Sequence, residues 1–291
     1  MPPPRETLRG RCCIALYFWF KRNRIRGRGL LMRTAVRVFP ELREYPLYFE
    51  GIGWRTVDIC VLAGFYLLEY SRMEAPQNGQ LIPALEGCLK PGDCFWDVGA
   101  NAGIVSLHFS QERFRLSRVD LFEPNPAFQK GHERLFSENP AVHVHPIGLS
   151  NLNGEQSLFL DSPFAPTASV TASVIREKNF HDSIPIILKR GDDLCADFNI
   201  PYPNVIKVDV EGHEEEVFQG LGQIIQKHRP ILFFEHVFLS DETIEQMRPE
   251  GYRLEFIMDD GTRSRSRVSG AGYDAIFIPD EKYESVVGME K

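Results

Sequence analysis

The stretch that decides the fold is CFWDVGANAG, residues 94–103. Its first part, Cys94–Val98, is mostly apolar, as expected of a strand covered on both faces. Gly99 permits a sharp turn after this strand, and Gly103 allows close approach of the backbone to a neighbouring element or a ligand. An apolar helical pattern begins at Ile104, so the stretch predicts a strand, a glycine loop and a helix in that order.

The alternation of strands and helices continues on the C-terminal side of this unit. Further strands are predicted at 119–122, 142–145, 184–188, 205–210, 231–234, 252–258 and 273–278, the last two as an antiparallel pair. Helices are predicted after Pro126 and over a segment with Val217, Leu221, Ile224 and Ile225 on one face. A hairpin is expected over 148–160 and a loop over 162–179. Repeated βα units predict an α/β fold with a mostly parallel sheet and helices on both faces.

Acidic residues surround the glycine loop. Asp97 precedes it, Asn101 lies within it, and Glu123 follows 20 residues after Gly103, at the end of the next strand. The spacing of Gly99 and Gly103 differs from the GxGxxG of dinucleotide-binding loops, and an acidic residue here would repel a pyrophosphate. A carboxylate at the position of Glu123 can accept both hydroxyls of a ribose. A nucleoside without phosphates that carries a positive centre fits this set, and S-adenosylmethionine is such a molecule.

A second polar group follows the strand at 205–210. Asp209 and Glu211 leave this strand at its carboxyl end, where they could orient an acceptor hydroxyl or offset a sulfonium charge. Lys207 alternates with Asp209, which predicts an ion pair between them. His236 ends the next strand and is a candidate proton acceptor, although a histidine in such a place is commonly a hydrogen-bonded scaffold group.

Metal binding is not expected from the sequence. None of the six cysteines has CxxC spacing, and no third ligand accompanies His143 and His145. Few and irregularly spaced cysteines are typical of a reduced intracellular protein.

Four segments together resemble the FkbM-type family of S-adenosylmethionine-dependent methyltransferases. They are FWDVGANAGIVSLHFS (95–110), LFEPNPAF (121–128), GLSNLNGE (148–155) and VIKVDVEGHEEEVFQGL (205–221). The resemblance covers roughly residues 90–280, and the pair DVGAN…G and KxDVEGxE is more specific than either motif alone.

The resemblance implies a class I, Rossmann-like methyltransferase fold: a seven-stranded, mostly parallel sheet whose last strand is antiparallel. It implies O-methylation of a sugar, glycolipid or polyketide-type hydroxyl. By position, Asp97, Gly99, Asn101 and Gly103 would form the cofactor loop, and Glu123 would hold the ribose. The DVEGxE motif includes Asp209, Glu211 and Glu214, while segment 190–193 is a looser version of the Leu-Asp segment often found before it. The acceptor pocket is therefore the least defined part of the resemblance.

The charge is divided along the chain. Of the 291 residues, the first 43 include eleven basic and two acidic residues, a formal charge of +9, whereas the net charge is −7. We therefore expect a basic leader (1–43), a helical and hairpin cap (44–89, with a helix at 57–70), the methyltransferase domain (90–280) and a tail (281–291). The acidic body argues against a nucleic-acid partner, although salt-dependent retention on RNA would revive that idea.

Three interpretations of the leader stay open. It is a solvated arm, or an anchor whose Ile14, Leu16, Tyr17, Phe18, Trp19 and Phe20 enter lipid while arginines meet anionic headgroups, or it is not made because translation starts at Met32. The apolar run at 12–20 is too short to span a membrane. We expect a cytoplasmic protein, with peripheral contact at the inner membrane surface if the leader is an anchor.

The sequence thus predicts an enzyme, an S-adenosylmethionine-dependent O-methyltransferase acting on a small-molecule or glycan acceptor. In this prediction Asp209 or His236 assists removal of the acceptor proton and Glu211 orients the acceptor. Methylation of nitrogen or of a protein side chain, and a non-catalytic nucleoside-binding protein with the same fold, are the alternatives. The oligomeric state and the acceptor's identity have no sequence signal.

Overall fold

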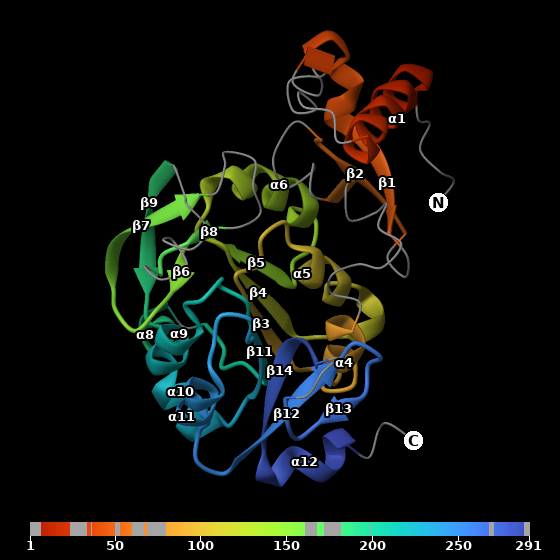
Figure 1. Ribbon diagram of the computed structural model, residues 1–291. Helices are drawn as coiled ribbons and strands as arrows, with labels where there is room; N and C mark the ends of the chain where they lie inside the picture. Colours follow the sequence, from red (N-terminus) through yellow and green to blue (C-terminus); the bar gives the residue numbers. More distant parts are fainter. Residues whose placement is uncertain are drawn as a thin grey trace.

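The centre of the computed structural model is an eight-stranded sheet with the order β13-β12-β14-β11-β10-β3-β4-β5 (Figure 1). The structure describes residues 7–23, 34–35, 37–49, 53–59, 67–68, 80–160, 168–171, 182–198, 200–267 and 271–287. The strands of this sheet are β3 (Cys94–Val98), β4 (Arg118–Phe122), β5 (Val142–His145), β10 (Val205–Val208), β11 (Ile231–Glu235), β12 (Tyr252–Met258), β13 (Arg263–Ser264) and β14 (Ala271–Pro279).

The strand directions confirm the predicted α/β fold. Strands β11, β10, β3, β4 and β5 pair in parallel, and β14 enters antiparallel between β11 and β12. The predicted count of seven strands is wrong by one. The eighth strand is the two-residue β13, which turns back onto β12 through a hydrogen bond from Met258 N to Thr262 O.

Alternate residues of the central strands enter two different cores, which explains why these strands lack a polar face. Phe95, Val205 and Phe233 pack on one face, while Trp96 and Ile206 pack on the other. Because adjacent residues on a strand point to opposite faces, the parity of a residue at a strand end decides which face its side chain joins.

The helices that cover the sheet are α4 (Leu81–Glu86), α5 (Ile104–Phe109), α6 (Pro126–Phe136), α8 (Gly191–Phe198), α9 (Glu214–Gly220), α10 (Gly222–His228), α11 (Asp241–Met247) and α12 (Asp280–Val287). They include those predicted after Gly103, after Pro126 and around Val217, and also α8, α11 and α12, which were not predicted. The single helix expected around Val217 and Ile225 is divided at Leu221. A Cβ at Gly220 would lie 1.9 Å from Ser150 O, so the end of α9 lies directly against another backbone.

A second, four-stranded sheet lies between β5 and β10 in the sequence and beside the main sheet in Figure 1. Its strands are β6 (Gly148–Leu149), β7 (Gly154–Leu160), β8 (Ala168–Ser169) and β9 (Asp182–Lys189). The hairpin predicted within 148–160 is wrong, because β6 and β7 each pair with β9 and not with each other. The loop predicted at 162–179 contains β8, and much of the rest of it lies outside the described residues.

The N-terminal part contains α1 (Leu8–Arg22), the 3-10 helix η1 (Pro40–Glu44) and an antiparallel pair, β1 (Tyr45–Phe49) and β2 (Gly53–Val57). The helix predicted at 57–70 does not begin at Val57, which ends β2, and most of that segment lies outside the described residues. Helix α12 occupies most of the segment predicted as a tail and buries Tyr283 and Val286. Within the described ranges, no helix is both long and apolar enough to cross a membrane.

Candidate active site

The glycine loop lies between β3 and α5, and its two glycines are required by the backbone. Both have positive φ, +74° at Gly99 and +80° at Gly103. A Cβ at Gly99 would lie 1.9 Å from Asp209 O, and one at Gly103 would lie 3.1 Å from the ring of Phe136. The spacing of these glycines therefore reflects packing against β10 and α6. Between them, Asn101 has a φ of 53°, a conformation that non-glycine residues seldom adopt.

Asp97 is the buried anchor of this loop. Its Oδ2 accepts hydrogen bonds from Ser106 N at 3.1 Å and Ser106 Oγ at 2.7 Å, which connects the end of β3 to the first turn of α5. Its Oδ1 lies 3.2 Å from Lys207 Nζ. Because Asp97 is completely buried, it acts on the loop through these contacts.

Glu123 joins the end of β4 to the same loop. Its Oε2 accepts a hydrogen bond from Asn101 N and its Oε1 accepts one from Asn125 N, each at 2.8 Å. Burial raises the pKa of Glu123 to about 7 against the opposing effect of these hydrogen bonds. Each carboxylate oxygen can accept a further hydrogen bond, so the predicted contact with a ribose is compatible with this geometry.

Lys207 is the cation around which the strand ends are arranged. Its Nζ lies 3.2 Å from Asp97 Oδ1 and 3.3 Å from Asp209 Oδ2, and it donates a hydrogen bond to Gly99 O at 3.1 Å. The predicted ion pair with Asp209 is thus confirmed. Burial opposes the charged amine, but Asp209 and Asp97 outweigh it and raise the pKa of Lys207. Asp209 is the partly exposed member, with 34% of its side chain accessible.

The loop after β10 is closed by Glu214. Its Oε1 accepts hydrogen bonds from Val210 N and Gly212 N, at 3.1 and 3.3 Å, and its Oε2 is buried with no hydrogen-bond partner in the described part of the chain. Burial raises the pKa of Glu214 to about 7. Glu211, in the middle of this loop, has a φ of 55°. Unusual backbone conformations at both loops are typical of ligand-binding positions.

The inserted sheet contacts this loop directly. Ser169 Oγ donates to Glu211 O at 2.9 Å, and Thr171 Oγ1 donates to Gly212 O at 2.8 Å. The sequence had indicated a Ser/Thr-rich loop here with no diagnostic pattern, so these two contacts were missed. They connect β8 to the predicted site.

The structure adds two carboxylates that were not predicted, Glu235 and Asp274. They are direct register partners on the antiparallel strands β11 and β14. Burial first, and then the neighbouring Asp209, Glu211, Glu214 and Asp274, raise the pKa of Glu235 to about 9. Burial and then Asp209 raise the pKa of Asp274 to about 7, while Lys207 opposes this. We call Asp209, Glu211, Glu214, Glu235 and Asp274 the carboxylate cluster.

His236 is not brought to this cluster. Its ring is buried edge-to-face against Phe256 of β12, with centroids 5.2 Å apart, on the face of the sheet that carries Trp96. Burial and then Arg267 lower the pKa of His236, while the backbone of Gly272 near the ring opposes this slightly. Its neighbour Glu235 has the opposite parity on β11, and this alternation is the signal that could have identified it.

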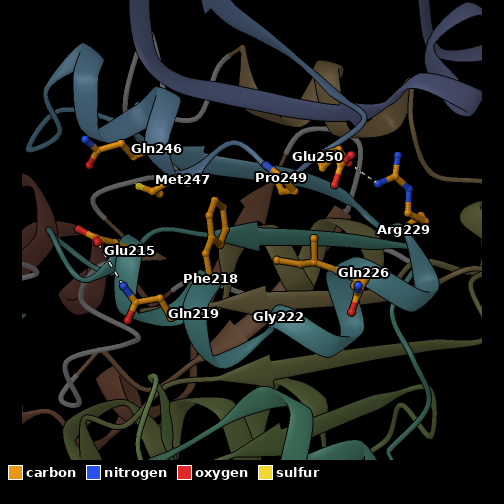
Figure 2. A pocket seen from close by; sticks show the side chains of 11 residues that line it. Glu215, Phe218, Gln219, Gly222, Gln226, Arg229, Gln246, Met247, Pro249 and Glu250 are labelled. Atoms are coloured by element: carbon orange, nitrogen blue, oxygen red, sulfur yellow. Dashed lines mark hydrogen bonds between the residues drawn. The ribbon is translucent and has the colours of Figure 1, made fainter.

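A surface pocket of about 490 Å³ lies elsewhere, between α9–α10 and the end of α11 with the segment that follows it. Figure 2 shows Phe218 and Gly222 on one side of it and Met247 and Pro249 on the other. No residue of the carboxylate cluster lines this pocket, and neither does Glu123. The pocket is therefore distinct from the predicted site.

Comparison with known proteins identifies relatives of this chain. The sequence pattern of the methyltransferase FkbM domain matches residues 97–256, which includes both loops and the ends of β4 and β11. Hexuronic acid methyltransferase AglP of Haloferax volcanii is 34% identical over 161 residues, which make up 54% of this chain and 62% of that protein. The similarity thus spans less than two thirds of that relative.

Two solved structures are also similar. An FkbM methyltransferase from Methylobacillus flagellatus has 18% identity and a TM-score of 0.45, over 84% of this chain and 59% of that one. An S-adenosylmethionine-dependent O-methyltransferase from Thermotoga maritima has 11% identity and a TM-score of 0.37, over 84% and 81%. The domain match covers more than half of the sequence, and the chain therefore belongs to the FkbM methyltransferase family.

Proposed function

We propose that this chain is an S-adenosylmethionine-dependent methyltransferase that methylates a hydroxyl of a sugar-type acceptor. The observation that carries the proposal is the excess of carboxylates where β3, β4, β10 and β11 end, opposed by Lys207 alone among the groups described above. The relative named as a hexuronic acid methyltransferase supports a sugar acceptor.

The residues present fit this cofactor. Glu123 retains acceptor capacity for the two ribose hydroxyls, and the buried Oε2 atoms of Glu214 and Glu235 have no hydrogen-bond partner in the described ranges. Burial and neighbouring carboxylates raise the pKa of Glu214 and Glu235, and a cation that binds beside them would stabilise their charged forms. When bound, S-adenosylmethionine supplies a methyl group on a positively charged sulfur. Glu123 would hold the ribose, and the carboxylate cluster would face the positive end.

Asp209 is the residue to which we assign removal of the acceptor proton. It is the partly exposed carboxylate beside Lys207, so a substrate can reach it. The raised pKa of Glu235, about 9, keeps its proton in place at neutral pH, so it can donate a hydrogen bond that orients the acceptor oxygen. Asp274 has a pKa of about 7 and can do the same in its protonated form. Glu211 keeps the orienting role predicted for it.

The same charge excess favours a hydroxyl acceptor over a carboxylate acceptor. An acceptor carboxylate would have to approach Asp209 and Glu211 against their charges. Alkaline hydrolysis of the labelled product separates the two outcomes, because a methyl ether is stable and a methyl ester is cleaved. Uronic-acid-containing glycans are suitable first acceptors, and mass spectrometry of glycans and lipids from a deletion strain would identify the natural one by loss of a single methyl.

The acceptor pocket is proposed to involve the inserted sheet and the N-terminal cap. Ser169 and Thr171 hold the loop after β10. The cap lies against α6, where Arg134 Nη2 lies 3.4 Å from Glu44 Oε1. We place the start of the catalytic domain after the cap, at residue 90. We assign the inserted sheet and the cap to recognition of the acceptor.

Binding of S-adenosylhomocysteine tests the cofactor assignment. In isothermal titration, Glu123→Ala should weaken binding about 10–100-fold, because the ribose hydroxyls lose a charged acceptor. Glu112→Ala, an exposed residue of the 3-10 helix η2 (Glu112–Phe114), is the matched control and should leave affinity unchanged. Absence of binding, or equal affinity of Glu123→Ala and the wild type, would refute the assignment.

The roles of Asp209 and His236 are separated by turnover. Asp209→Asn should lower kcat about 10²-fold or more, as expected for loss of a general base, while affinity for S-adenosylhomocysteine, which lacks the sulfonium charge, changes little. His236→Asn should retain turnover close to that of wild type, because its ring lies on the other face of the sheet. If His236→Asn loses turnover while its folded stability is intact, the proton acceptor is assigned incorrectly. A protein that binds the cofactor without any turnover would support the non-catalytic alternative.

A further inference from the structure

Helix α1 has a face that the rest of the protein does not cover. Leu8, Leu16 and Trp19 are 76%, 42% and 54% exposed, and Cys12 and Ala15 between them are also exposed. Spacings of three and four residues place these side chains on one side of a helix. They form an apolar stripe along the length of α1, which we call the α1 stripe.

The opposite face of α1 is fixed to the protein. Ile14 and Tyr17 are buried in the same core as Leu42 and Tyr45. Gly10 lies so close that a Cβ there would be 3.3 Å from the ring of Tyr45. The anchor predicted from sequence is thus corrected, because Ile14 and Tyr17 cannot enter lipid while α1 is docked. The residues available to a partner are those of the α1 stripe.

Arginines border the stripe on both sides. From helical periodicity, Arg9 lies along one edge, and Arg11 and Arg22 lie along the other. All three are exposed. The sequence has no acidic residue from 7 to 40, so this part of the chain has only positive formal charges.

We infer that the α1 stripe docks the protein on an anionic lipid membrane, with Leu16 and Trp19 in the acyl boundary and the flanking arginines at the headgroups. Apolar residues bordered by basic ones are the pattern of helices that lie in the plane of a membrane interface. Tryptophan prefers this depth, and each arginine near an anionic surface adds to the attraction. The inference concerns where the protein is held and does not depend on methyl transfer.

Co-sedimentation of the full-length protein with vesicles tests this inference. Binding is expected with mixed phosphatidylcholine and phosphatidylglycerol, should weaken with salt, and should be much weaker with phosphatidylcholine alone. The double variant Leu16→Glu/Trp19→Glu should lower the partition coefficient at least about tenfold, which corresponds to about 1.4 kcal/mol. Both positions are exposed, so the fold should be retained, and circular dichroism checks this.

A matched control carries the same added charge elsewhere. Leu152→Glu/Tyr202→Glu replaces two apolar side chains that are each 47% exposed, and it should bind vesicles like the wild type. A blue shift of tryptophan emission on adding anionic vesicles is also expected. Trp19→Phe should lose it and Trp54→Phe should keep it, because Trp96 is already buried and Trp54 lies on β2, outside the α1 stripe.

Several results would overturn the inference. They are no binding to anionic vesicles, equal binding of the Leu16→Glu/Trp19→Glu variant, and N-terminal mass spectrometry showing that the native protein starts at Met32. Salt-dependent retention on RNA without vesicle binding would assign the arginines to a nucleic acid. A dimer disrupted by the same double variant, again without vesicle binding, would assign the stripe to a second copy of the chain.

Discussion

At the scale of single residues, Gly99 connects the two loops of the candidate site. A Cβ at this position would lie 1.9 Å from Asp209 O, so no side chain separates the glycine loop from the loop that begins at Asp209 after β10. The sequence indicated a turn at Gly99, but it held no information about the element that the turn touches.

Gly99→Ala should destabilise the protein by about 3 kcal/mol or more, because it adds a clash with backbone to the cost of a positive φ. Gly92→Ala is the matched control, since Gly92 also has a positive φ (+92°) but nothing within 4 Å of the added Cβ. It should cost only about 1 kcal/mol. Urea denaturation measures both, and similar losses in the two variants would contradict the close approach.

The residues of the candidate site differ in how far the neighbouring sequence identifies them. Asp97, Asn101 and Glu123 follow strands whose apolar patterns are readable, and the structure brings all three together. Glu235 has the same local signal as His236, and only its parity on β11 assigns it to the site. Asp274 has no sequence signal, because its place depends on where β14 inserts.

At the scale of elements, Asp192 gives a structural role to segment 190–193, the looser version of the Leu-Asp segment. Its Oδ2 and Oδ1 accept hydrogen bonds from Gln223 N and Ile224 N, at 3.1 and 3.0 Å, so a residue of α8 caps the first turn of α10. Gly191 permits this contact, since a Cβ there would lie 2.3 Å from the side chain of Leu221.

Asp192→Ala should lower the free energy of unfolding by about 1–3 kcal/mol, because two amides at a partly buried helix start lose their acceptor. The neighbouring Asp193 is partly exposed and bonds Asn153 at the surface, so Asp193→Ala should cost less than about 1 kcal/mol. Thermal and urea unfolding would measure the difference. If the two variants were equally stable, the cap would be energetically unimportant.

Helices and strands were predictable where an apolar pattern extends over many residues. The βα units and the antiparallel strands 252–258 and 273–278 follow from apolar periodicity, and they occur as predicted. Strands β8 and β13 have two residues each, too few for any period. The hairpin at 148–160 failed because turn residues indicate a reversal of the chain, while the partner strand β9 lies further along the sequence.

At the scale of the whole molecule, the carboxylate cluster sets how stability depends on pH. The folded state raises the pKa of Glu214 and Asp274 to about 7 and that of Glu235 to about 9. Between their ordinary values and these raised ones, the folded state binds more protons than the unfolded state, so stability falls as pH rises. His132 acts in the other direction at lower pH, because burial lowers its pKa to about 4.

The free energy of unfolding should therefore decrease from about pH 6.5 to pH 9, by up to about 1.4 kcal/mol per pH unit for each extra proton held. Glu235→Gln should be more stable than the wild type at pH 8 and show a shallower decline, while Glu112→Gln keeps the wild-type slope. Urea titrations at several pH values measure this. A wild-type stability that increases over this range would show that the cluster is not desolvated as described.

The insertion of β14 between β11 and β12 has a consequence for biosynthesis. Strand β11 is apolar, and its outer edge gains a partner only when β14 has left the ribosome. The chain from Glu235, where β11 ends, to Asp274 takes roughly 2–8 s to translate at typical bacterial or eukaryotic speeds. During that interval the nascent protein has a half-built sheet with an open apolar edge, a known hazard for misassociation. Because Asp274 arrives with β14, the enzyme cannot complete its charged centre before this strand has been made.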